Sequence, residues 1–365
     1  MFKILTAGLL AFLYVGCSQV PKPVASLNQA DTVEQHILTG MSLLASQKRQ
    51  EAVTQCKRAV SLAPQNASAF ICLALATQDT SVLEKSFDFI DNAVDSYRYH
   101  VAKVRMSEVD EAYEHYKMAK NIEVKYLPYY NDKESADYFL ALKYFEYLEY
   151  EKTREFSAHV FKNAQAKFAP QSRVLWERVD RVIRALALSE FTVTAKKLVL
   201  NEQIKRVDIA VVLEDELALA KIMKGAFQAD RKAFAKKVSK DVQSHPNLPQ
   251  IEVFYKYGLR GLEPKVSQGN EMFLPNSFIT RADFSLLLED IIAKVLHDTK
   301  LKTTFFGNKS LFVDVTNDSY YFNAVNTAVA RGFLKANINS AFRPHEYLTG
   351  IELIEAIARV KEEMR

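Results

Sequence analysis

The sequence predicts a mostly α-helical protein, in which a solenoid of helical hairpins precedes a domain of three related helical modules. Composition is the first reason. Glycine and proline number only ten each in 365 residues, and long stretches are rich in Ala, Leu, Lys and Glu, which favours helices over strands. Internal repetition is the second, because one pattern recurs in the first half and a twelve-residue stretch recurs in the second. The length leaves room for two or three domains.

Composition also limits the function. With 48% apolar and 25% charged residues, the chain has the balance of a soluble globular protein. A net charge of +4, with basic and acidic residues interleaved, argues against nucleic acid as a partner. The seven histidines are scattered, and neither a Cys-x-x-Cys nor a glycine-rich phosphate loop occurs. We therefore expect no metal, no cofactor and no enzymatic activity.

The N-terminus has the pattern of an export signal. Lys3 precedes an apolar run from residue 4 to 15, which is about 18 Å long as a helix and too short to span a bilayer of about 30 Å. Tyr-Val-Gly-Cys, ending at Cys17, resembles the lipobox of bacterial lipoproteins, and Ser18 resembles their outer-membrane sorting signal. The resemblance implies a signal peptide at 1–16, acylation of Cys17 and a tether at 17–30. The alternative is an ordinary signal peptide with a chance cysteine.

Residues 31–189 have the spacing of helical hairpins. Small residues at Gly40 and Ala52 allow two helices to approach closely, Ala59 makes room for the next unit, and Pro64 ends the second helix. The segment resembles a tetratricopeptide repeat. Degenerate copies of the spacing follow at Ala112, Tyr116 and Ala119, and at Ser157, Phe161 and Ala164. The helix around 176–188 would cap the solenoid.

Two features of this region leave alternatives open. Cys56 and Cys72 lie within apolar helical periodicity, so we expect buried thiols unless their Cα atoms approach closely enough for a disulfide. Tyrosines cluster at 126–152, and most of this aromatic stripe is expected to be core. The candidates for a surface that binds a protein partner are Tyr129, Tyr130, Tyr147 and Tyr150.

The second half contains three related stretches. Residues 273–284 align without a gap with 342–353, and a weaker copy lies at 198–209. An Asp-Val pair, at Asp241 and Asp314, precedes the last two copies. The pattern resembles the S-layer homology family, with modules at about 190–225, 241–295 and 312–360, and the last resembles it most.

The resemblance implies a three-helix pseudo-trimer whose grooves bind anionic cell-wall polysaccharide, often carrying ketal-linked pyruvate, through a motif similar to Ile-Thr-Arg-Ala-Glu. The matching stretches are 279–283, with an arginine, 204–208, with an arginine, and 348–352, with Gly350 in its place. The resemblance implies these candidates for glycan contact: Arg281, Thr280, Asp283, Arg206, Asp208, Tyr320 and Tyr321.

A structural role competes with binding at each candidate. Thr280 with Asp283, and Thr349 with Glu352, fit capping boxes. The arginines are expected to point outward from the first helical turn, where the helix dipole disfavours a cation but a ligand carboxylate or phosphate would accept its fork. The aromatic side chains near residue 320 fit either sugar stacking or an ordinary core.

The combined prediction is an exported lipoprotein of the bacterial outer membrane, on its periplasmic or cell-surface face. It would bind wall polysaccharide or peptidoglycan through the three modules and recruit a protein through the solenoid. The alternative keeps the fold and makes the chain an assembly factor for an envelope complex, with the three modules as a protein contact.

Overall fold

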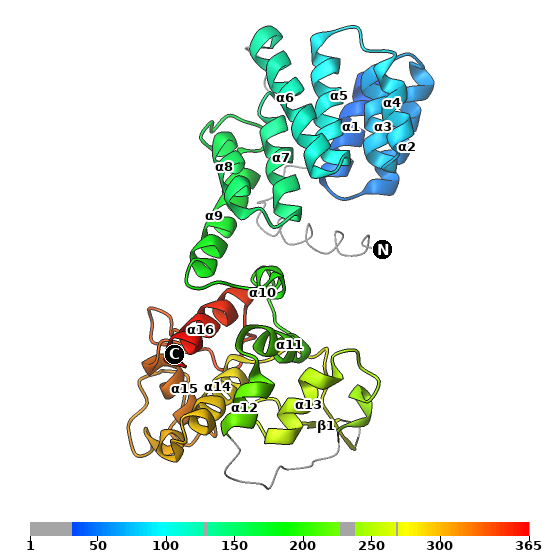
Figure 1. Cartoon of the computed structure of the whole chain (residues 1–365). Coiled ribbons are helices and arrows are strands. Elements are labelled where there is room, and N and C mark those ends of the chain that lie inside the picture. Colours follow the sequence, from blue (N-terminus) through cyan, green and yellow to red (C-terminus); the bar gives the residue numbers. More distant parts are fainter. Residues whose placement is uncertain (1–30, 128–129, 131, 227–237, 268, 365) are drawn as a thin grey trace. The chain divides into compact units, whose positions relative to one another are not determined.

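A computed structural model describes residues 31–127, 130, 132–226, 238–267 and 269–364 (Figure 1). The chain is mostly helical and divides into two compact units between Asp180 and Arg181, which we call the helical-repeat unit and the three-module unit. The predicted fold class, a helical-hairpin solenoid followed by a helical pseudo-trimer, is confirmed. The predictions for the signal peptide, Cys17 and Tyr129 lie outside the described residues.

The helical-repeat unit is built from antiparallel hairpins. Side chains at Thr32, Asn66 and Asn92 accept amide hydrogen bonds at helix starts, as expected for N-cap residues. Hairpins form between α1 and α2, between α5 and α6, and between α7 and α8. The elements are α1 (Val33–Ala45), α2 (Arg49–Leu62), α3 (Ala67–Thr77), α4 (Thr80–Phe87), α5 (Ala93–Met106), α6 (Val109–Tyr126), α7 (Ser135–Glu146), α8 (Tyr150–Phe161) and α9 (Ala169–Leu186).

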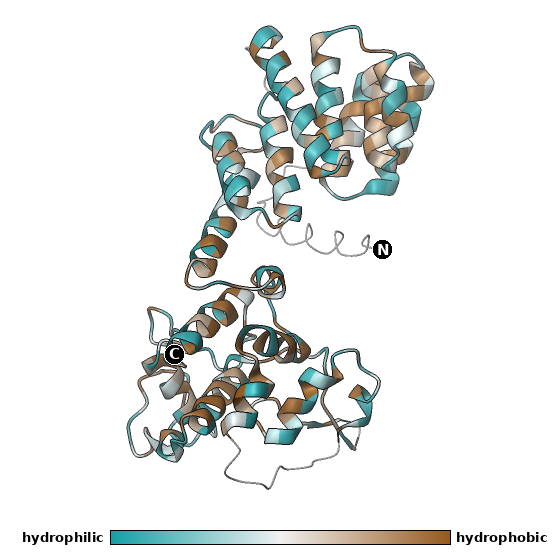
Figure 2. Ribbon diagram, viewed as in Figure 1, coloured by the Kyte–Doolittle hydropathy of each residue, from teal (hydrophilic) through white to brown (hydrophobic). Residues whose placement is uncertain are grey.

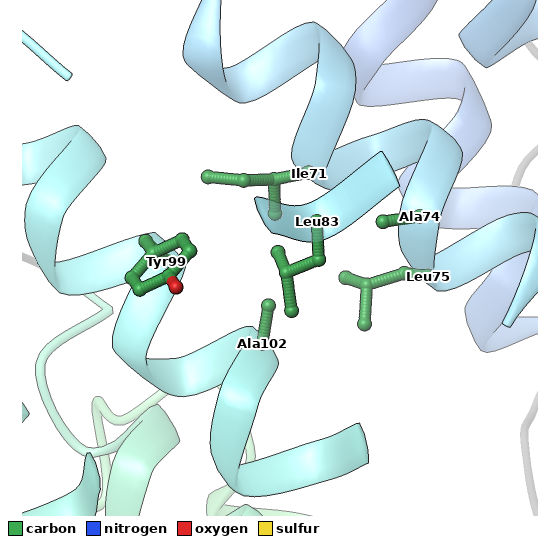
Figure 3. Close-up of a cluster of buried hydrophobic side chains, with 6 residues drawn as sticks. All are labelled: Ile71, Ala74, Leu75, Leu83, Tyr99 and Ala102. Carbon is green, nitrogen blue, oxygen red and sulfur yellow. The ribbon is translucent and has the colours of Figure 1, made fainter. Parts of the chain in front are cut away.

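Apolar side chains between the helices form the core of this unit. Figure 2 shows hydrophobic and hydrophilic residues on different faces of the same helices. One cluster joins α3, α4 and α5 (Figure 3), and consists of Ile71, Ala74, Leu75, Leu83, Tyr99 and Ala102. Burial of each large apolar side chain in such a cluster contributes about 1.5–3 kcal/mol.

A disulfide crosses the first repeat. Cys56 in α2 and Cys72 in α3 are bonded, with their Cα atoms 5.5 Å apart. The expectation of buried thiols is therefore wrong, although both residues are buried. Gly40 explains how the bridge fits, because a Cβ built there would lie 2.7 Å from Cys56 Sγ and 2.8 Å from Cys72 Sγ. The small residue predicted from the hairpin spacing thus makes room for the bridge.

In its described residues the three-module unit is also helical, with one short hairpin of strands. Strands β1 (Lys265–Ser267) and β2 (Asn270–Met272) pair antiparallel ahead of the loop that leads into α14 (Arg281–Val295). The other elements are α10 (Val193–Leu198), α11 (Arg206–Leu217), α12 (Leu219–Ala226), η2 (Lys240–Val242), α13 (Leu248–Tyr257), η3 (Thr299–Thr303), α15 (Phe322–Ala330) and α16 (Gly350–Glu363).

A closed ring of backbone hydrogen bonds joins the three modules. The amide of Ile204 donates to Leu348 (3.0 Å), that of Leu348 to Ile279 (3.0 Å), and that of Ile279 to Ile204 (2.9 Å). All three side chains are fully buried, and each precedes the N-cap residue of α11, α14 or α16. The aligned stretches of sequence are therefore symmetry-related, and the pseudo-trimer closes within one chain.

Candidate functional site

Arg206 and Arg281 begin helices α11 and α14. They have exposed fractions of only 0% and 1%, so the expectation that they point outward is wrong. The reason is that the loop of the next module packs over the start of each helix. This loop begins at Phe273 for α11 and at Phe342 for α14. Backbone amides at residues 206 and 207 donate to that loop, and so do those at 281 and 282.

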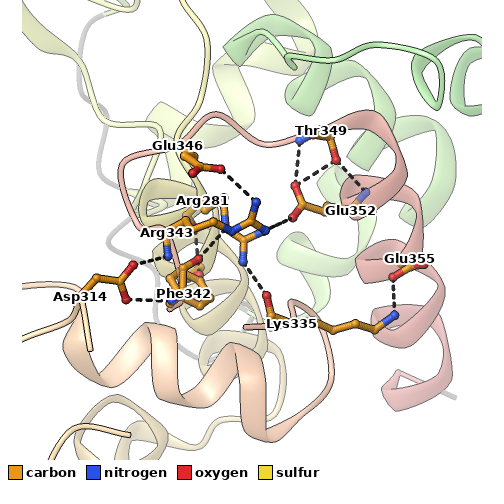
Figure 4. A network of polar contacts seen from close by, with 10 residues as sticks. Arg281, Asp314, Lys335, Phe342, Arg343, Glu346, Thr349, Glu352 and Glu355 are labelled. Carbon is orange, nitrogen blue, oxygen red and sulfur yellow. Dashed lines mark hydrogen bonds and ion pairs between the residues drawn. The ribbon is translucent and has the colours of Figure 1, made fainter. Parts of the chain in front are cut away.

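We call the contact between one module and the next a junction. The second junction, between the second and third modules, consists of Arg281, Lys335, Phe342, Arg343 and Glu352 (Figure 4). Arg281 Nε donates to the Phe342 carbonyl at 2.9 Å, and Nη2 donates to the Lys335 carbonyl at 2.8 Å. Its guanidinium lies 4.6 Å from the centre of the Phe342 ring. Nη1 pairs with the Glu352 carboxylate, which Arg343 Nη2 also approaches, at 3.6 Å. All three guanidinium nitrogens of Arg281 therefore have partners within the chain. Arg343 Nε is buried without an acceptor among the described residues, but the charge of this guanidinium is matched by Glu346 at 3.0 Å and by Glu352.

The first junction consists of Arg206, Glu263, Lys265, Phe273 and Asp283. Arg206 Nε donates to the Phe273 carbonyl and Nη2 to the Glu263 carbonyl, both at 2.7 Å. The guanidinium lies 4.9 Å from the centre of the Phe273 ring. In contrast to Arg281, Nη1 of Arg206 is buried and donates to no acceptor among the described residues. One donor of a buried cation is thus left without a partner.

Burial affects both arginines electrostatically. It lowers the pKa of each guanidinium, and nearby carboxylates oppose the shift: Asp283 and Glu263 at Arg206, and Glu352 at Arg281. An arginine nevertheless keeps its proton in proteins, so both sites hold a buried cation. Such a group is costly unless its donors are matched by acceptors.

Two aspartates shape the loops that cover the arginines. Asp241 accepts the amides of Phe273 (3.1 Å) and Leu274 (2.7 Å), and Asp314 accepts the corresponding amides of residues 342 and 343 (2.8 and 2.7 Å). Leu274 and the equivalent residue, Arg343, have positive φ, at 57° and 62°. The carboxylates therefore stabilise turns that favour glycine. Sequence reasoning gave these aspartates no functional role, although the repeated Asp-Val pair was a signal.

The acidic residues that follow the arginines differ in their contacts. Thr349 and Glu352 form the predicted capping box. Thr280 accepts the amide of Asp283 at 3.1 Å, but the Asp283 carboxylate pairs instead with Lys265 Nζ, also at 3.1 Å. Asp208 is partly buried and accepts the Lys205 amide at 3.0 Å. Lys265 was not predicted to belong to the site.

The third junction, between the third module and the first, has no space for an arginine. A Cβ on Gly350 would lie 2.0 Å from the Leu198 carbonyl oxygen and 2.8 Å from that of Val199. Backbone atoms therefore occupy the place that a longer residue would need. The glycine in the third copy of the motif fits this close contact.

The two candidate tyrosines separate in the structure. Tyr320 is 71% exposed; partial burial raises the pKa of its phenol, and nearby Asp283 raises it further. Tyr320 is therefore an accessible aromatic side chain within electrostatic range of Asp283 in the first junction. Tyr321 is buried, and its ring makes an edge contact with His345, with ring centres 5.8 Å apart.

The tyrosines predicted as a partner surface also divide. Tyr150 is only 6% exposed because it packs against Phe145. The prediction that it belongs to a partner surface is therefore wrong. Tyr130 is partly buried and makes an edge contact with Tyr97. Tyr147 is 43% exposed, and its hydroxyl donates to Glu108. Among the described candidates, Tyr147 presents most surface.

The described residues hold neither a cluster of metal ligands nor a membrane-spanning helix. In those parts of the chain, no group of three or more His, Cys, Asp or Glu side chains has an arrangement that could hold a metal ion. Across the same ranges, no helix is both long enough and apolar enough to cross a bilayer.

Comparison with known proteins identifies the last module. Residues 311–354 match the S-layer homology domain. The match includes Asp314, Phe342 and Glu352, and thus most of the second junction. This domain is a non-enzymatic module that binds cell-wall polymers, such as secondary wall polysaccharide or peptidoglycan, and it associates a protein with the cell surface or envelope. No curated protein and no solved structure gives a significant match to the chain.

Proposed function

We propose that the chain is an exported, lipid-anchored envelope protein without enzymatic activity, which binds an anionic cell-wall glycan through its three modules. The match to the S-layer homology domain supports wall binding. The observation that carries the assignment to the first junction is the accessible Lys265–Asp283 pair, with the exposed Tyr320 within electrostatic range of Asp283. An aromatic face and a cation together suit a charged sugar.

The first junction offers accessible groups as well as buried ones. The side chain of Lys265 is 50% exposed, so its ammonium group can exchange Asp283 for a ligand anion. Arg206 is buried at the same junction and adds positive potential. Alanine at either arginine would remove a buried cation and its carbonyl contacts, so Tyr320 and Lys265 are better positions at which to test binding.

The anchor and the compartment rest on other observations. The lipobox-like sequence at Cys17 supports acylation and an outer-membrane location, with the wall reached from the periplasmic or cell-surface side. The Cys56–Cys72 disulfide supports export, because such bonds persist in oxidising compartments. The helical-repeat unit would recruit a protein partner, and Tyr147 is its exposed candidate contact.

Co-sedimentation of the purified chain with wall sacculi tests the proposal. We expect Tyr320→Ser/Lys265→Ala to weaken binding at least tenfold, equivalent to about 1.4 kcal/mol. A matched control is Tyr126→Ser/Lys125→Ala, which removes another exposed tyrosine with a lysine 5.0 Å from its ring centre. Equal weakening by both variants would contradict the assignment to the first junction.

The alternative function has one observation in its favour. At the second junction Arg281 is already paired with Glu352, and at the third Gly350 leaves no space for a cation. A unit that has lost glycan binding at two junctions could instead serve as a protein contact in an envelope assembly factor. In that case the chain would remain with envelope proteins after all wall polymer is removed.

A further inference from the structure

The first and second junctions have the same framework. In each, Nε of the arginine donates to the carbonyl of an aromatic residue, Phe273 or Phe342, and Nη2 donates to a second carbonyl. In each, the guanidinium also stacks on that aromatic ring. The frameworks differ at one atom, because Nη1 of Arg281 has a carboxylate partner and Nη1 of Arg206 has none among the described residues.

The lengths of two acidic side chains explain the difference. Glu352 and Asp283 occupy equivalent positions, three residues after the N-cap residue. Glu352 is long enough for one oxygen to accept the Thr349 amide at 3.0 Å while the other pairs with Arg281. Asp283 is one methylene shorter, and its carboxylate turns to Lys265.

We infer that the two junctions are functionally unequal: Glu352 supplies an internal anion to the second, whereas the first has no such anion at Arg206 Nη1, and the half-exposed Lys265 there admits one carboxylate or phosphate group of the ligand. The chain then binds a single anionic group. This inference rests on the proposed glycan binding and specifies its stoichiometry and its ligand chemistry.

Physical chemistry favours occupancy of the first junction. A buried donor without an acceptor destabilises a protein by about 1–3 kcal/mol, and by more when it belongs to a charged group. An oxyanion at Arg206 Nη1 would remove this penalty and form a short, charge-assisted bond. Lys265, half-exposed, can turn from Asp283 to the same anion. At the second junction an external anion would have to displace Glu352 from Arg281.

Exchange of the acidic side chains between junctions tests the inference. Asp283→Glu adds the methylene that lets the internal carboxylate reach Arg206, and Glu352→Gln removes the charge from Arg281 while keeping an oxygen for the cap. We expect the full chain carrying Asp283→Glu to lose at least tenfold in affinity for sacculi. Adding Glu352→Gln should restore binding to within about threefold, now at the second junction. Asp298→Glu, which lengthens the aspartate that caps η3, is the control.

Chemical treatment of the sacculi, which serve as the probe, identifies the anionic group. Hydrofluoric acid removes phosphate-linked polymer, and carbodiimide coupling to glycinamide neutralises carboxylates, so loss of binding after one treatment identifies the source. Melting temperatures verify that each variant is folded, and Asp283→Glu is expected to melt higher than the parent chain because it pairs Arg206.

The outcomes separate the two proposals. No sedimentation of the parent chain would overturn glycan binding and this inference together. Sedimentation of the parent that Asp283→Glu leaves unchanged would overturn only the inequality of the junctions. Loss in Asp283→Glu with recovery in the double variant supports it.

Discussion

The Cys56–Cys72 disulfide gives the most direct prediction about stability. The two cysteines are separated by 16 positions in sequence. Closure of a loop of this length raises the free energy of the unfolded chain by about 3 kcal/mol. In a domain of ordinary stability, at about 5–15 kcal/mol, this is a large share. We therefore expect reduction to lower the melting temperature of the helical-repeat unit by about 6–12 °C.

The measurement is differential scanning calorimetry of a Cys17→Ser chain with and without reductant. Since the sequence has three cysteines, this background leaves only the bonded pair. The three-module unit serves as an internal control, because its transition should not move. Alkylation of both cysteines in denaturant without reductant would show that the bond is absent, and an unchanged transition after verified reduction would refute the stability argument.

Three further predictions concern packing, the loop-capping carboxylate of Asp314 and pH. Gly350→Ala should destabilise the three-module unit by at least about 2 kcal/mol in urea unfolding, because its Cβ would meet the Leu198 carbonyl oxygen; Gly225→Ala, with no atom within 4 Å, should be neutral or stabilising. Asp314→Ala leaves two loop amides without their acceptor and should cost about 2–3 kcal/mol in the same assay, whereas no change would exclude a structural role. Burial lowers the pKa of His100 from 6.5 to about 4. The unfolded chain therefore binds more protons between these values, so stability should fall by about 1–2 kcal/mol as pH drops from 6.5 to 4, allowing for partial exposure. A His100→Gln variant with an equally steep pH dependence of melting would contradict this.

The sequence predicts the architecture well because its signals are local. Close approach and ending of helices within one hairpin are indicated by Gly40, Ala52 and Pro64. The aligned twelve-residue stretches indicate three modules. The ring through Ile204, Ile279 and Leu348 follows the same alignment, since equivalent residues meet around the pseudo-threefold axis. That the ring closes within one chain could be learned only from the structure.

The details of the site depend on contacts between modules, which a single sequence does not reveal. Arg281 begins a helix, so its own segment indicates exposure, but Phe342 and Lys335 lie more than fifty residues further along the chain and bury it. The cysteine pair likewise requires the distance between two helices. A one-methylene difference between Asp283 and Glu352 gains its meaning only once both lie beside an arginine.

The most direct test of the central claim is a binding isotherm for the full chain on sacculi before and after removal of their attached polymers. We expect saturable sedimentation with intact sacculi, a stoichiometry of one anionic group per chain, and loss of binding once the polymers are removed. Equal sedimentation with intact and stripped sacculi, or none with either, would contradict wall-polymer binding by the three-module unit.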